Sequence, residues 1–130
     1  MYKRDLITAE IQKLADVLAK ILKLTFDGDL ENADILFNET IAHSFGLSPS
    51  LLFDPELKNF IASINANELP AEKLDMLSRF LYIRWNDSED PEFRRALSQK
   101  LDFLYTRLEQ TYHIVSFENI QRRQIIAKYL

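Results

Sequence analysis

Cysteine is absent from the 130-residue chain, and glycine occurs only twice, at Gly28 and Gly46. Without cysteine the chain has no disulfide framework, no Cys-ligated zinc site and no thiolate nucleophile. Two isolated glycines cannot form the glycine-rich loops that hold nucleotide phosphates, because those motifs place glycines a few residues apart. Sheet proteins spend more glycine on turns and bulges, so this scarcity, with only four prolines, favours long helices.

Long apolar runs are also missing from the sequence. A helix needs about 18 to 20 consecutive apolar residues to cross a bilayer, and the chain offers no such run. Asp5 and Glu10 interrupt the apolar residues that follow the start Met1-Tyr2-Lys3-Arg4, so we expect no signal peptide. These features predict a cytoplasmic protein of bacterial type.

The length of the chain fits one domain, which we predict to cover residues 1–130. Apolar residues make up 47% of the chain and charged residues 28%, a balance typical of a globular protein. The net charge of −4 is unevenly spread, because residues 27–92 carry four basic and fourteen acidic side chains. Both ends of the chain are mildly basic. Either the ends fold back onto the acidic middle, or copies associate through opposite patches.

Apolar residues recur at spacings of three and four along most of the chain, which is typical of amphipathic helices. The pattern is clearest in the fifth predicted helix, where Phe93, Leu97, Leu101, Leu104 and Leu108 form one stripe. The predicted helices cover about 2–25, 30–45, 55–65, 70–85, 91–112 and 117–129, with a short turn at 49–53. We therefore predict an all-α fold of about six helices in successive antiparallel hairpins, the alternative being a compact irregular bundle.

The first predicted turn, Gly28-Asp29-Leu30-Glu31-Asn32-Ala33, is followed by Phe37 and resembles the turn of a tetratricopeptide repeat. That resemblance implies antiparallel helix pairs joined by short turns. The segments Tyr2-Lys3-Arg4-Asp5-Leu6-Ile7 and Glu72-Lys73-Leu74-Asp75 are similar to those of small helical bacterial proteins without an assigned function. This second resemblance implies a helical fold and no particular mechanism.

Two Glu-x-x-x-His pairs, Glu39 with His43 and Glu109 with His113, place both members on one helix face. Four such ligands from two facing helices could bind a metal, as in di-iron bundles. Both histidines are, however, expected in the last turn of a helix, where a cation offsets the helix dipole. We therefore predict no metal site and no cofactor.

Other charged clusters have equally ordinary explanations. Acidic residues at 31, 34, 39 and at 89, 90, 92 suit a solvated face and a helix start, so no catalytic residue is predicted. The pairs Arg94-Arg95 and Arg122-Arg123 make the last third basic, but the chain as a whole is acidic and we expect no nucleic-acid partner. Acidic residues dilute the basic face of the first helix, so membrane binding is not expected either.

The fourth predicted helix is richer in large side chains than one buried face requires. Its two apolar stripes leave Arg79, Tyr82, Arg84 and Trp85 as additional residues. Either the helix is buried on nearly all sides, with Trp85 capping the core, or these four residues form an exposed strip. Trp, Tyr and Arg are enriched at binding hot spots, so the strip is the predicted partner site.

The function predicted on these grounds is that of a non-enzymatic interaction module. It would bind a protein or peptide, or a second copy of itself, near the fourth helix. Two alternatives stay open: a structural homodimer whose acidic middle meets basic ends, and a cryptic small-molecule or metal-dependent enzyme.

Overall fold

The computed structural model describes residues 2–130, with side-chain environments from residue 4 onward. Within that range it contains six α-helices and two short 3₁₀ helices and no strand, which confirms the predicted all-α fold. The elements are α1 (Tyr2–Phe26), α2 (Leu30–Phe45), η1 (Pro49–Leu52), α3 (Leu57–Asn67), α4 (Ala71–Asp87), α5 (Pro91–Tyr112), α6 (Phe117–Ile126) and η2 (Ala127–Tyr129).

Local capping signals explain why the bounds of α2 and α5 agree with the sequence prediction. The Asp29 carboxylate accepts a hydrogen bond from the backbone N–H of Asn32, and Gly46 ends α2 with a φ of 70°. Asp90 caps α5 in the same way, accepting from the N–H of Glu92, and Pro91 occupies the first helical position. A carboxylate cap satisfies a helical N–H that otherwise has no partner.

Four predicted bounds are wrong by two or three residues. Helices α3 and α4 each continue two residues past the predicted end, to Asn67 and Asp87. Helix α3 begins at Leu57 rather than Pro55, because the Asp54 carboxylate accepts from the N–H of Glu56 and holds a turn there. The last helix is α-helical only to Ile126, and the chain continues as the 3₁₀ turn η2.

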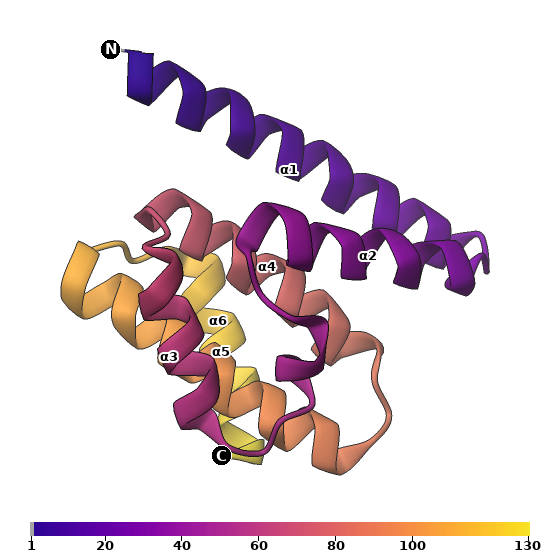
Figure 1. Cartoon of the computed structure of the whole chain (residues 1–130). Coiled ribbons are helices and arrows are strands. Elements are labelled where there is room, and N and C mark those ends of the chain that lie inside the picture. The colour runs from indigo at the N-terminus through magenta and orange to yellow at the C-terminus, as the bar shows by residue number, and fades with distance from the viewer. Residues whose placement is uncertain (1) are drawn as a thin grey trace.

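Helix α4 lies at the centre of the arrangement (Figure 1). The hairpin of α1 and α2 packs against one side of α4, and α5 packs along another. Helix α6 and η2 lie against α5, while α3 contacts α5 and η1. The N-terminal half of α1 reaches the start of α4, where Arg4 and Glu10 contact Glu72 and Lys73.

The core is continuous around α4. Phe80 is fully buried at its centre, with ring centroids 6.3 Å from Phe37 and 5.5 Å from Phe45, both on α2. On the α5 side the predicted stripe is buried at Leu97, Leu101, Leu104 and Leu108. Truncating such a buried phenylalanine to alanine typically costs about 3–5 kcal/mol, so this aromatic cluster is a main source of stability.

Ion pairs join the basic first helix to the acidic middle of the chain. Arg4 contacts Glu72 at 3.0 Å, and Lys73 contacts Glu10 at 2.6 Å. The basic N-terminal end of the chain therefore folds back onto the acidic middle, as the first of the two interpretations of the charge pattern predicted. The Arg4–Glu72 pair lies at the surface and contributes little to the free energy of unfolding, whereas the side chain of Lys73 is largely buried.

The contact between α6 and the rest of the protein is unusually polar. Only Asn119 and Ile126 of α6 are buried, and the Asn119 amide donates to the Asp75 carboxylate of α4 at 3.0 Å. Among the described residues, the Tyr105 hydroxyl and Asn119 Oδ1 are buried without a hydrogen-bond partner. Both residues line a small hollow of about 30 Å³, which is large enough to hold a water molecule.

Burial raises the pKa of the Tyr105 hydroxyl well above its ordinary value of 10.0, and Arg122 offsets only part of that effect. Above pH 10 the unfolded chain loses this proton and the folded protein keeps it, so stability falls as the pH rises. We expect Tyr105→Phe to change the free energy of unfolding by less than about 1 kcal/mol at pH 7, because the hydroxyl has no partner. Above pH 10 the variant should lose less stability than the wild type.

Urea unfolding at pH 7 and above pH 10 measures both effects, with Tyr112→Phe as the control on the exposed end of α5. A loss of about 1–3 kcal/mol at pH 7 for Tyr105→Phe would contradict the prediction. It would show that the hydroxyl does have a partner, such as a water in the small cavity.

Candidate functional site

The four residues predicted as a partner site all lie on α4, but the structure does not bring them together on one exposed surface. Trp85 is only 3% exposed. Tyr82 lies partly buried beneath Arg122 of α6, whose guanidinium carbon is 4.7 Å from its ring centroid. Arg79 pairs with Asp75 on its own helix, at 3.3 Å. Arg84 faces α2 instead.

Trp85 is enclosed by three residues from two later segments, α5 and η2. Its indole N–H donates to the hydroxyl of Ser98 on α5 at 2.8 Å. Tyr129 of η2 meets the ring edge-on at 5.3 Å, and the guanidinium of Arg94 lies 4.5 Å from the ring centroid. Arg94 also donates to the carbonyl of Trp85. Of the two arrangements left open by the sequence, the structure therefore shows the one in which Trp85 belongs to the core.

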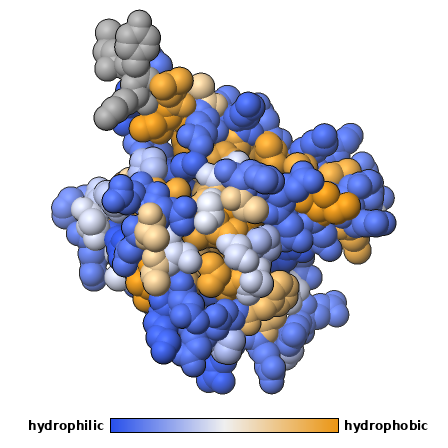
Figure 2. Space-filling view, viewed as in Figure 1, coloured by the Kyte–Doolittle hydropathy of each residue, from blue (hydrophilic) through white to orange (hydrophobic). Residues whose placement is uncertain are grey.

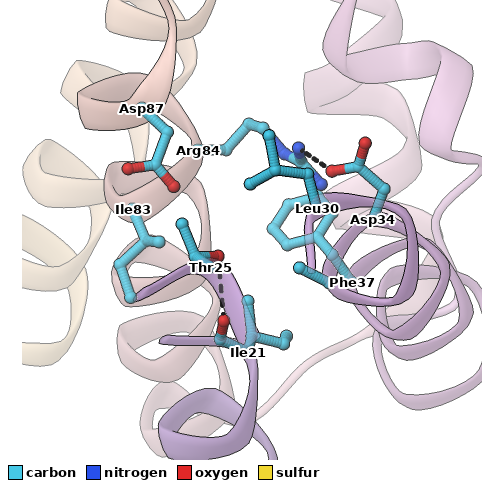
Figure 3. Close-up of a pocket in the computed structure, with 9 residues that line it drawn as sticks. Ile21, Thr25, Leu30, Asp34, Phe37, Ile83, Arg84 and Asp87 are labelled. Carbon is cyan, nitrogen blue, oxygen red and sulfur yellow. Dashed lines mark hydrogen bonds and ion pairs between the residues drawn. The ribbon is translucent and has the colours of Figure 1, made fainter. Parts of the chain in front are cut away.

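Arg84 crosses from α4 to α2. Its guanidinium pairs with Asp34 at 2.5 Å and lies 4.2 Å from the ring centroid of the buried Phe37 (Figure 3). The charge of Arg84 is thus neutralised within the protein, and its side chain forms a bridge over the α2–α4 contact.

A hollow of about 200 Å³ lies beside this bridge, between the end of α1, the start of α2 and the end of α4 (Figure 3). Its walls are mainly apolar, with Ile21, Leu30 and Ile83 among them. The Thr25 hydroxyl, also in the lining, already donates to the carbonyl of Ile21. The polar groups that remain are those of Arg84, Asp34 and Asp87.

Two further hollows adjoin the first and share Arg84 with it. One, of about 270 Å³, lies at the α4–α5 connection, and the other, of about 110 Å³, lies between α2 and η1. We call the three together the Arg84 groove. Its lining residues are Ile21, Thr25, Leu30, Ala33, Asp34, Phe37, Asn38, Leu52, Phe53, Ile83, Arg84, Asp87, Ser88, Asp90 and Phe93.

Phe53 forms an aromatic wall of the groove. It is 68% exposed and stacks on Phe93 of α5 with ring centroids 4.7 Å apart. Lys100, almost fully buried on α5, donates from its ammonium group to the carbonyl of Asp54 at 2.7 Å. This bond fixes the segment that carries Phe53. Burial lowers the pKa of Lys100, an effect that Asp54 opposes.

Asp87 differs from the other acidic residues of the groove. Asp34 is paired with Arg84, and Asp90 caps α5, whereas in Figure 3 no hydrogen bond or ion pair joins Asp87 to the other residues drawn. Partial burial raises the pKa of Asp87; Arg84 lowers it and Asp34 raises it further. Asp87 as a residue is exposed and lines two of the three hollows, so it is accessible from the groove.

Sequence reasoning identified Arg84 but not Phe53 or Asp87. It assigned Phe53 to a short turn and placed Asp87 in a polar loop after the fourth helix. The sequence does contain one signal for Phe53. It is a large aromatic side chain in a short turn, and such a turn has no apolar helix face that would bury it. At the end of the α1–α2 hairpin, Leu30 and the 91%-exposed Phe26 are exposed apolar residues. Figure 2 shows apolar surface among hydrophilic residues at the side of the molecule where Figure 1 places this hairpin end.

The histidine pairs do not form a metal site in the part of the chain that the structure describes. His43 lies in the last turn of α2, and His113 follows α5 with a φ of 57°. Glu109 pairs with Arg123 at 3.0 Å. Among residues 2–130, no three His, Asp or Glu side chains gather as metal ligands, and no helix is long and apolar enough to cross a bilayer.

Comparisons of the chain with protein-family models, with curated proteins and with solved structures find no match.

The hydrogen bond of the buried Trp85 indole leads to a prediction about the free energy of unfolding. Ser98→Ala removes the acceptor of the buried indole N–H, and leaving such a donor unpaired costs about 1–3 kcal/mol. We expect that loss in urea unfolding, together with weak acrylamide quenching of Trp85 in the wild type. Ser50→Ala, at an exposed position of η1, is the control. Strong quenching of the wild-type emission would contradict the buried placement.

Proposed function

We propose that this protein is a non-enzymatic interaction module that binds a segment of another protein in the Arg84 groove. The observation that carries the proposal is the run of three adjoining hollows with an exposed aromatic wall at Phe53. Large exposed aromatic side chains beside hollows are typical of binding surfaces, because they offer much contact area at a low entropy cost.

The dimensions of the groove suit a polypeptide better than a small molecule. Pockets for small ligands usually enclose about 300–1,000 Å³ in one cavity. Here the space is divided into hollows of about 200, 270 and 110 Å³, with Arg84 bordering each of them. A segment can place successive side chains in such hollows, whereas a compact ligand fills only one.

The chemistry of the groove also supports binding over catalysis. A catalytic acid or base needs a second reacting group within hydrogen-bond reach. Asp34 and Arg84 neutralise each other, and Asp90 is engaged in capping α5. Lys100, whose pKa is also shifted, directs its ammonium group to a backbone carbonyl and does not line the groove.

The test uses a library of random twelve-residue peptides selected against the immobilised wild-type protein. We expect Phe53→Ser to weaken the selected peptides by at least about tenfold, since truncating an interface aromatic often costs 1–2 kcal/mol or more. The matched control is Phe117→Ser, which removes an exposed phenylalanine at the start of α6. Helix α5 spans about 33 Å between these two regions, so the control leaves the groove intact.

Both phenylalanines are mostly exposed, so neither variant should unfold the protein; circular dichroism and urea unfolding verify this. Equal loss of binding in the two variants, or in neither, would contradict the proposal. Light scattering of the protein alone provides the second readout. Dimerisation that Phe53→Ser abolishes would place a second copy in the groove and favour the homodimer instead.

A further inference from the structure

The hollow between α1, α2 and α4 combines two features that one type of side chain satisfies together. Its walls are apolar, with Ile21, Leu30 and Ile83 among them, and an unpaired carboxylate, that of Asp87, stands at its rim. Lysine and arginine have a long apolar stem and a cationic head, and they bury the stem while the head stays near water or an anion.

The position of Asp87 within α4 points to a role other than stability. Asp87 is the last residue of α4, and the C-terminal end of a helix carries partial negative charge. A carboxylate there is unfavourable, and the nearby charge of Arg84, which lowers the pKa of Asp87, offsets only part of the effect of burial. The acidic residues at the starts of α2 and α5, in contrast, are explained by capping and by the favourable end of the dipole.

The other charges of the groove leave this carboxylate as the one that a partner can neutralise. Three acidic residues, Asp34, Asp87 and Asp90, and one basic residue, Arg84, line the groove. Since Asp34 neutralises Arg84, the net field over the hollow is negative. A cation entering the hollow would also offset the partial burial that raises the pKa of Asp87.

We propose that the partner of the Arg84 groove is a basic, partly apolar peptide segment, with one Lys or Arg side chain lying in the α1–α2–α4 hollow and pairing with Asp87. This inference rests on the proposed function and names the chemistry of its partner. The stem of the basic residue packs on Ile21 and Ile83, and apolar side chains of the same segment contact Phe53 and Phe93.

The experiment measures dissociation constants for peptides whose binding depends on Phe53. Each Lys or Arg of such a peptide is replaced in turn by norleucine, which keeps an apolar stem without the charge. We expect one replacement to weaken binding to the wild type by about tenfold or more, as for other hydrogen bonds to charged groups. The same replacement should have little effect on binding to Asp87→Asn, because the carboxylate that it would meet is gone.

Glu39→Gln is the matched control, since it neutralises an exposed carboxylate that lines a different hollow of α2, with Lys20 and Leu24. It should bind all peptides as the wild type does. Raising the salt concentration should weaken peptide binding to the wild type more than to Asp87→Asn. The urea midpoint of Asp87→Asn should be unchanged or slightly raised, which separates a binding role from a structural one.

The outcomes distinguish the proposed function, an interaction module, from the proposed chemistry of its partner, a basic segment. Phe53-dependent peptides that lack basic residues, or that bind Asp87→Asn as tightly as the wild type, would overturn the basic partner and leave the interaction module standing. Peptides that bind independently of Phe53, or a selection that yields none, would overturn both. The norleucine replacements alter only the peptide, so they decide the question even where a protein variant loses stability.

Discussion

Helix α4 is enclosed by other helices on nearly all sides, and the rest of the structure depends on this enclosure. A helix that is buried all round must find partners for its polar side chains, because an unpaired buried polar group is costly. Asp75 receives the Asn119 amide, Arg84 reaches Asp34, and the Trp85 indole donates to Ser98. These contacts attach α6, α2 and α5 to α4 at defined points.

Arginine over an aromatic ring recurs around this central helix. Arg84 covers Phe37, Arg94 covers Trp85 and Arg122 covers Tyr82. Each guanidinium seals the edge of the core with an apolar face while its charge stays near a carboxylate, a carbonyl or solvent. The residue types that favour partner binding are therefore used here largely within the chain, which is why composition alone could not separate the two uses of Trp85.

The sequence predicted features that depend on near neighbours along the chain and missed those that depend on distant ones. Asp29 and Gly46 set the ends of α2 through contacts within a few residues, so both ends were predictable. The burial of Trp85 depends on Arg94, Ser98 and Tyr129, whose approach requires the assembled fold. The Arg84 groove was unpredictable for the same reason, since five segments contribute to it.

The groove lies where several helices begin or end. Beside the middle of α4, neighbouring helix bodies run past and fill the space, so Leu77, Phe80 and Leu81 are completely buried. Beside its last turn, α1 ends, α2 and α5 begin, and η1 crosses, so helix ends meet where helix bodies would pack. Helix ends leave gaps, and the cap of α5, Asp90, adds a carboxylate to the lining of the groove. Capping accounts for Asp29 and Asp90 but not for Asp87, which stands at the wrong end of its helix. A cationic partner would turn this unfavourable position into a favourable one.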